Sequence, residues 1–282
     1  MRSTLISFFG TAVLGLLLIG GVNAQYRTVE RELIAHQKAK LDRRADVVFV
    51  GDSSLGNSLD AELASRLSGK VVANLALTGA YAVPGCLEML QQYIARHGAP
   101  QQIWIVQAID VLERQIDARR VAQTLRDASL FESAFKLVDL REATAATQQA
   151  LLLQGQDPLD GDYIRQAAPL HAADIPADLK LLPVSLSNVK ALRSIANLCR
   201  THGIRCALAI GPNARKQEAV ARAYIETIPK VLPAAVRLEG RTPFWIDDDQ
   251  LGDSPNHVHP RYRAQYTEKW ACLIAPRAGC RL

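Results

Sequence analysis

The chain has 282 residues, of which 49% are hydrophobic and 22% charged, and its formal net charge is +5. This length and apolar content can build the full core of one α/β domain, or of one domain with a subdomain. Lys and Arg are spread along the chain with few aromatic residues between them, so we expect no nucleic-acid partner. No cysteine or histidine cluster has zinc spacing, so we expect no metal site, and we expect no cofactor.

The N-terminus carries an almost uncharged run over residues 5–22, after Arg2. Such a run is close to the ~20 residues that a membrane-spanning helix needs. It ends in Val-Asn-Ala at residues 22–24, which resembles a signal-peptidase site. Residues 1–24 are therefore either a cleaved secretory signal or a retained single-span anchor, and the length of the run favours the anchor slightly. Both alternatives predict a periplasmic or other extracytoplasmic protein.

The cysteines agree with export. Cys199 and Cys206 flank a predicted helix-to-strand junction, and Cys272 and Cys280 lie close together near the C-terminus. Two short loops closed by disulfides suit an oxidising compartment. We expect the pairs Cys199–Cys206 and Cys272–Cys280, although sequence alone does not fix connectivity, and Cys86 is left as a buried free thiol.

The secondary structure alternates along the chain after residue 44. Residues 25–44 are charged and predict a stalk helix, and short apolar, β-branched runs then predict strands buried on both faces. A helix is expected to follow Ser53 and to end at Gly69, and another to end at Gly98. The predicted strands are residues 46–50, 71–75, 103–106, 206–210 and 236–238, and the predicted helices include 87–97 and 266–274.

This alternation predicts a three-layer α/β/α fold, a doubly wound parallel sheet, over residues 45–282. Residues 116–185 lack the alternation and predict a mostly helical insertion that caps the sheet. Ligands of such sheets bind beyond the carboxyl ends of the strands. Three turns lie at such ends, namely Gly-Asp-Ser at 51–53, Thr-Gly at 78–79 and Gly-Pro-Asn at 211–213.

Ser53 is the candidate nucleophile of this edge. It lies where a strand turns into a helix, so its hydroxyl is expected to project above the sheet, and the helix N-terminus adds amide donors. A serine hydroxyl is a weak nucleophile that needs a base and donors for the oxyanion. The alternative is that Ser53 is an ordinary helix N-cap.

A late loop offers the base. The segment 251–260 reads Leu-Gly-Asp-Ser-Pro-Asn-His-Val-His-Pro and contains Asp253, His257 and His259, in a chain with only six histidines. The alternative is a solvated polar loop. Together with Ser53, the order Ser, Asp, His predicts a catalytic triad.

These segments resemble the conserved blocks of the SGNH/GDSL hydrolase superfamily. Residues 49–55, Phe-Val-Gly-Asp-Ser-Ser-Leu, look like block I, and Gly79 resembles the block II glycine. The region from Asp253 to His257 resembles the C-terminal acid–histidine block. The resemblance spans about two-thirds of the chain and implies a flavodoxin-like sheet.

By this resemblance Ser53 is the nucleophile, His257 the general base and Asp253 the residue that orients it. The backbone N–H groups of Ser53 and Gly79 would form part of the oxyanion hole.

Two departures from the superfamily leave alternatives open. Its third block has a Gly-x-Asn whose asparagine donates to the oxyanion, and the matching stretch here has none, so either Gln107 substitutes or the hole rests on backbone donors. The superfamily's acid and histidine usually have the spacing Asp-x-x-His, whereas here Asp253 and His257 are one residue further apart. Asp249 or His259 could therefore hold a role given to Asp253 or His257.

An exported chain with the stretch Gly-Asp-Ser-Ser-Leu-Gly-Asn is similar to the acyltransferase-type members of bacterial polysaccharide acetylation systems, which act beside a membrane-bound O-acyltransferase. We therefore expect acyl transfer, with acetyl as the expected group, to or from a cell-surface polysaccharide through an acyl-serine. The alternatives are an extracytoplasmic carboxylesterase or deacetylase and a polysaccharide-binding protein with weak or no catalysis. The missing asparagine favours the binding protein, whereas Ser53, Asp253 and His257 oppose it.

Overall fold

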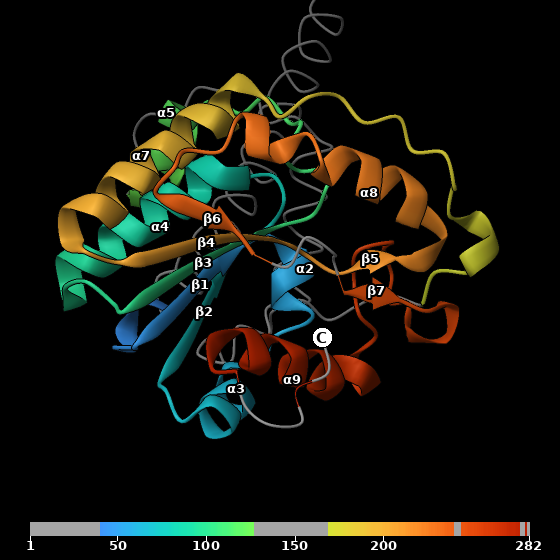
Figure 1. The fold of residues 1–282 in the computed structure, drawn as a ribbon, viewed down its shortest axis with the longest axis horizontal. Coiled ribbons are helices and arrows are strands. Elements are labelled where there is room, and N and C mark those ends of the chain that lie inside the picture. Colours follow the sequence, from blue (N-terminus) through green and yellow to red (C-terminus); the bar gives the residue numbers. More distant parts are fainter. Residues whose placement is uncertain (1–39, 127–168, 240–243, 277–279, 281–282) are drawn as a thin grey trace, which may run out of the picture.

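The computed structural model of the chain describes residues 40–126, 169–239, 244–276 and 280. Five parallel strands form one sheet in the order β2-β1-β3-β4-β6 (Figure 1). All five predicted strands are confirmed to within a few residues. Two further short strands, β5 and β7, pair in parallel beside it. The strands are β1 Val47–Gly51, β2 Val72–Ala76, β3 Gln102–Gln107, β4 Arg205–Ile210, β5 Asn213–Ala214, β6 Val236–Leu238 and β7 Trp245–Ile246.

Helices flank both faces of the sheet. In Figure 1, α4, α5 and α7 lie above the strands, and α3 and α9 lie below them. Side chains of β1 alternate between two cores: Val48 and Val50 pack in one, Val47 and Phe49 in the other. A strand covered on both faces buries every residue, which explains its continuous apolar sequence. The helices are α2 Ser53–Gly56, α3 Ala61–Ser68, α4 Ala82–His97, α5 Ala118–Arg126, α7 Leu186–His202, α8 Glu218–Ile225 and α9 Arg263–Ile274.

Aromatic packing holds α9 against the sheet. Phe49 stacks on Trp104 with ring centroids 5.8 Å apart, and its ring also meets Trp270 of α9 edge-on at 5.8 Å. The indole Nε1 of Trp270 donates to Ser58 Oγ at 3.0 Å. Large aromatic side chains bury much apolar area each, so this cluster fixes α9 beside the segment that links α2 to α3.

The helix predicted between Ser53 and Gly69 is two helices in the structure, because the chain breaks after α2. The backbone N–H of Asn57 donates to Ser53 O at 3.0 Å, and Asp60 then caps α3 by accepting from Leu63 N at 2.8 Å. An N-cap carboxylate satisfies amides that have no partner within the helix, so Asp60 starts a new helix. Gly69 ends α3 in the left-handed conformation, with φ of 68°.

The predicted insertion at 116–185 is described in two parts. Residues 118–126 form α5, and residues 169–185 hold one short 3-10 helix, Ala172–Asp174. These two described parts contain no strand of the sheet. Residues 127–168 lie outside the described chain.

The predicted signal or anchor at 1–24 and most of the stalk at 25–44 also lie outside the described residues. Within the described end of that stretch, Lys40–Asp42 form a 3-10 turn. The ammonium of Lys40 is buried and donates to Ala76 O at 2.7 Å, which ties this turn to the end of β2. None of the helices in the described ranges is both long and apolar enough to cross a bilayer.

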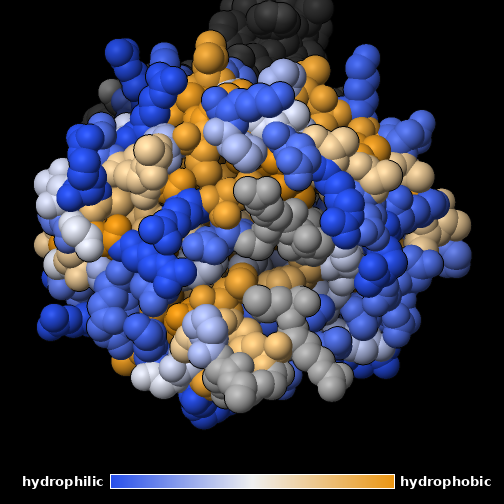
Figure 2. Space-filling view, in the orientation of Figure 1, coloured by the Kyte–Doolittle hydropathy of each residue, from blue (hydrophilic) through white to orange (hydrophobic). Residues whose placement is uncertain are grey.

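The surface in the view of Figure 2 is hydrophilic around its margin, with a band of hydrophobic side chains that runs from the upper edge toward the middle. Large exposed hydrophobic residues in the described chain are Val71, Leu182 and Leu186. Leu182 precedes α7 and Leu186 is its first residue, so this end of α7 presents apolar surface.

Both predicted disulfides are confirmed. Cys199 near the end of α7 is bonded to Cys206 in β4, and Cys272 in α9 is bonded to Cys280. Cys86 is a buried free thiol, as expected. Each bridge closes a short loop, so each ties a helix end to the chain segment that follows it.

Replacing both Cys199 and Cys206 by Ala should lower the free energy of unfolding by about 2–3 kcal/mol, because the unfolded chain loses a constraint on a short loop. Urea denaturation of the variant and the wild type measures the difference. Peptide mapping without reduction should recover the linked pairs from protein isolated from its native compartment. Five freely alkylated thiols in that protein would refute the pairing.

Candidate active site

The carboxyl end of β1 packs directly on β3. A Cβ on Gly51 would lie 2.2 Å from Val106 O, so only glycine allows this close approach. The next residue, Asp52, is 1% exposed and accepts three hydrogen bonds: Ser54 N at 2.8 Å, Ser54 Oγ at 2.6 Å and Ala108 N at 2.7 Å. Its carboxylate therefore joins the exit of β1 to the exit of β3.

The cost of this arrangement is the burial of a carboxylate. Burial raises the pKa of Asp52, and the hydrogen bonds from Ser54 and Ala108 oppose the shift. Buried charges are tolerated when they are fully hydrogen-bonded, and both oxygens of Asp52 have donors. The turn is thereby fixed by contacts that the sequence pattern alone did not reveal.

Ser53 is held by its backbone and left accessible at its side chain. Its carbonyl accepts from both the N–H and the Nδ2 of Asn57, at 3.0 and 2.9 Å. Between residues 51 and 59, all of which the structure describes, only Ser53 is not buried. Its hydroxyl makes no hydrogen bond within the described chain. Because α2 has only four residues, its dipole adds little to this position.

The two other predicted oxyanion residues lie in different surroundings. Gly79 follows β2 and is half-buried, and a Cβ there would lie 3.1 Å from both Val111 and Arg114 side-chain atoms. Gln107 ends β3 and is fully buried, with its Nε2 donating to Cys86 Sγ at 3.1 Å. Its Oε1 finds no partner among the described residues. The amide of Gln107 therefore faces the core in this structure.

Cys86 beside Gln107 stays a thiol. Burial raises its pKa, and the nearby charge of Asp52 raises it further. Since the thiolate is the nucleophilic form, Cys86 is a packing residue in this state of the protein.

The late loop presents an Asp–His pair. His257 Nδ1 lies 2.8 Å from Asp253 Oδ1, and both side chains are mostly buried, with 12% and 19% exposed. Gly252 N donates to His257 O at 2.8 Å, and an isolated antiparallel bridge joins Leu251 to Val258. The loop is therefore a narrow hairpin with the pair at its tip.

The two residues that the sequence left as alternatives are engaged elsewhere. Asp249 accepts from Tyr262 Oη at 3.2 Å, and His259 Nδ1 accepts from Arg261 N at 3.2 Å. His259 thus caps a short 3-10 turn on the surface. In the structure, Asp253 is the carboxylate within hydrogen-bonding distance of His257.

Two sets of contacts bring this loop to the edge that carries Ser53. On one side, Ala214 N in β5 donates to Pro255 O at 2.7 Å, and β5 follows the end of β4 at Gly211. A Cβ on Gly211 would lie 2.0 Å from Ser54 Oγ, so this strand end packs directly on α2.

On the other side, α9 continues from the loop and packs on the α2–α3 segment. Thr267 Oγ1 accepts from Asp60 N at 2.9 Å, and Arg263 Nη2 donates to Leu59 O at 2.8 Å. The loop and α2 therefore share the carboxyl edge of the sheet (Figure 1). No hydrogen bond joins Ser53 to His257 in the described structure.

The sequence did not predict that the end of the insertion contacts the Asp–His loop. Leu170 N donates to Gly252 O at 2.7 Å, and Ile175 packs in a small apolar cluster with Leu251 and Val258. The end of the insertion therefore supports the Asp–His loop. Isolated apolar residues in a polar, proline-containing segment were the available signal.

Asp52→Asn should lower the free energy of unfolding by about 1–3 kcal/mol, because one carboxylate oxygen becomes an NH₂ group that faces a buried N–H or O–H donor. Asp60→Asn is the matched control and should be nearly neutral, since asparagine caps helices as well as aspartate. Urea denaturation compares the two variants. An Asp52→Asn protein as stable as the control would remove Asp52 from its anchoring role.

Comparisons with protein-family models, with curated proteins and with solved structures return no match. Among the described residues, no three His, Cys, Asp or Glu side chains gather where they could hold a metal ion.

Proposed function

We propose that the protein transfers an O-acyl group, with acetyl as the expected group, to or from a cell-surface polysaccharide through an acyl-serine at Ser53. The observation that carries this proposal is the hydrogen-bonded Asp253–His257 pair on the same edge as the one accessible residue of the 51–59 segment. Numbered among themselves, the five sheet strands run 2-1-3-4-5, the flavodoxin-like order. This order supports the resemblance to SGNH/GDSL hydrolases.

In the first half-reaction, Ser53 Oγ attacks the carbonyl carbon of the donor ester while His257 Nε2 takes the serine proton. Asp253 holds the Nδ1–H of the ring and stabilises the imidazolium. The oxyanion accepts from the N–H groups of Ser53 and Gly79. The tetrahedral intermediate then expels the donor alkoxide, which takes the proton from His257, and the acyl group remains on Ser53.

In the second half-reaction, His257 takes the proton of an acceptor hydroxyl, whose oxygen attacks the acyl-serine. Collapse of this intermediate forms the new ester and returns the proton to Ser53. A sugar hydroxyl as acceptor gives transfer, and water gives hydrolysis. The two activities share every residue of the site, so an esterase or deacetylase is the same proposal with a different acceptor.

Two features of the structure predict slow turnover. Ser53 and His257 are not hydrogen-bonded, and general-base catalysis requires that they approach on substrate binding, as is common in ligand-free enzymes. Gln107 donates to Cys86, so the oxyanion hole rests on backbone donors. A missing donor lowers the rate by about 10²–10³-fold.

The expected surroundings follow from the two disulfides together with the apolar run at 5–22, which favour a periplasmic or other extracytoplasmic site of action. An acylated sugar or polysaccharide is the proposed substrate, and a membrane-bound O-acyltransferase is the proposed partner that supplies acyl groups.

The position of the Gln107 amide also favours a second candidate, a polysaccharide-binding protein of the same fold without turnover. Such a protein keeps the accessible serine and the Asp–His pair but never forms an acyl-enzyme. Covalent labelling separates the two candidates.

Ser53→Ala should abolish acyl-enzyme formation with nitrophenyl acetate and labelling by a fluorophosphonate, because Ser53 carries the proposed nucleophile and is the residue of the 51–59 segment that is not buried. Intact-protein and peptide mass spectrometry locates the adduct. Ser254→Ala, in the Asp–His loop, is the control and should label normally. A label on another serine would overturn the assignment, and a folded wild type that never labels would favour the binding protein.

His257→Ala should reduce the acylation rate by about 10²–10⁴-fold, since the general base is lost. Asp253→Ala should cost less, because the carboxylate orients the ring and does not itself take the proton. His259→Ala is the matched control, two residues away and on the surface, and should leave the rate unchanged. Stopped-flow measurement of nitrophenol release gives all three values. Equal losses at His257 and His259 would contradict the role of His257.

A further inference from the structure

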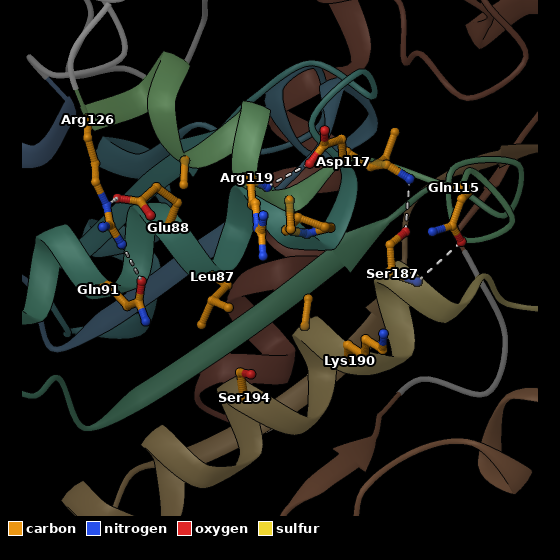
Figure 3. Close-up of a pocket in the computed structure, with 15 residues that line it drawn as sticks. Leu87, Glu88, Gln91, Gln115, Asp117, Arg119, Arg126, Ser187, Lys190 and Ser194 are labelled. Atoms are coloured by element: carbon orange, nitrogen blue, oxygen red, sulfur yellow. Dashed lines mark hydrogen bonds and ion pairs between the residues drawn. The ribbon is translucent and has the colours of Figure 1, made fainter.

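A groove of about 500 Å³ lies between the helices on one face of the sheet, and Ser53 is not among the residues that line it (Figure 3). Helix α4 forms its floor, and α5 and α7 form its two walls. The apolar part of the lining includes Leu87, Ala122 and Ala191. This volume is within the range of about 300–1,000 Å³ that is typical of small-molecule sites.

Hydrogen bonds define both ends of the groove. At one end, Ile116 N donates to Ser187 Oγ at 2.9 Å, which joins the segment before α5 to the start of α7. At the other end, Arg126 Nε donates to Glu88 Oε1 at 2.7 Å, and Arg126 Nη2 lies 3.3 Å from Gln91 Oε1. The groove is therefore a bounded trough (Figure 3).

The trough is lined by the cations Arg119, Arg126 and Lys190 and by the carboxylates Glu88 and Asp117, so the formal net charge of its lining is +1. The carboxylate of Glu88 is buried and paired with Arg126, and the carboxylate of Asp117 accepts from backbone N–H groups at the start of α5. Arg119 of α5 and Lys190 of α7 are exposed, and their side chains have no ion pair within the described chain. Figure 3 shows these two side chains on opposite walls, Arg119 on α5 and Lys190 on α7.

Polar groups without charge complete the lining. The amides of Gln91 and Gln115 and the hydroxyl of Ser194 border the same space. A sugar ring offers hydroxyls to such groups and an apolar face to a floor like that of α4, and a carboxylate on the sugar would complement the two cations.

The trough also begins close to the candidate active site. Gln115 at its end is the neighbour of Arg114, whose guanidinium lies against Gly79. A polysaccharide segment bound in the trough would therefore continue toward the edge that carries Ser53.

We propose that the trough between α4, α5 and α7 binds a short carboxylate-bearing segment of a polysaccharide, with Arg119 and Lys190 holding the carboxylates from opposite walls. This inference rests on the proposed function for the identity of the polymer as substrate. Binding itself requires no catalysis, so the two can be tested apart.

The test is isothermal titration of the full chain, at physiological salt, with a galacturonic-acid pentasaccharide, with neutral maltopentaose and with inorganic phosphate. Arg119→Gln and Lys190→Gln should each weaken binding of the acidic pentasaccharide by about three- to tenfold, the usual range for a partly exposed charge contact. Arg193→Gln is the matched control, because it removes the same charge from α7 outside the trough, and it should change the affinity by less than about twofold. Maltopentaose should not bind, and phosphate should not displace the acidic pentasaccharide.

Several outcomes would overturn the proposal. The first is that the acidic pentasaccharide does not bind at millimolar concentrations, and the second is that Arg119→Gln, Lys190→Gln and Arg193→Gln weaken its binding equally. The third is that maltopentaose binds as well as the acidic pentasaccharide. The fourth is that phosphate displaces the acidic pentasaccharide, which would assign the site to a small anion. Ser53→Ala should bind like the wild type. If the protein binds the acidic pentasaccharide but is never labelled at Ser53, the binding proposal stands and the acyl-transfer proposal is rejected. If Ser53 is labelled but no pentasaccharide binds, the acyl-transfer proposal stands and the binding proposal is rejected.

Discussion

The carboxylate of Asp52 is the contact on which the proposed site depends most. Where β1 and β3 end, backbone N–H groups leave the hydrogen-bonded ladder inside the protein and need acceptors. Asp52 supplies them, accepting from Ala108 N at the end of β3 and from the N–H and hydroxyl of Ser54. Because these bonds fix the turn from both sides, Ser53 is held in a defined position while its own hydroxyl stays unbonded.

The second half of the proposed site comes from a segment about two hundred residues further along the chain. The Asp253–His257 loop is positioned by its neighbours, and its flanking residues Leu251 and Val258 are buried in an apolar cluster. Helix α9 is held by Trp270 against Phe49 and Ser58, and the opposite side of the loop is bonded to β5 through Pro255. The relative position of the two halves of the proposed site is thus a property of the core between α9 and the sheet.

The amino-acid sequence by itself determined the five sheet strands, the close spacing of the cysteines that form the two disulfides, and the turns at which the candidate site residues lie. These features have local causes. A strand covered on both faces needs a continuous apolar run, as at 47–50, and a glycine such as Gly69 permits the left-handed end of a helix. Cysteines seven or eight residues apart across a turn, such as Cys199 and Cys206, can meet without help from distant parts of the chain.

Only the tertiary structure decided the features that depend on residues far apart in the sequence. It broke the helix after Ser53, because the capping of α3 and the packing of α9 act together at Asp60. It turned the amide of Gln107 to Cys86, although the pattern offered Gln107 as a donor at the surface edge. It also placed the end of the insertion under the Asp–His loop and opened a trough between three helices. Local patterns specify which residues are apolar, charged or flexible, whereas the partner of a buried polar group is chosen by whatever the folded chain brings within hydrogen-bonding distance.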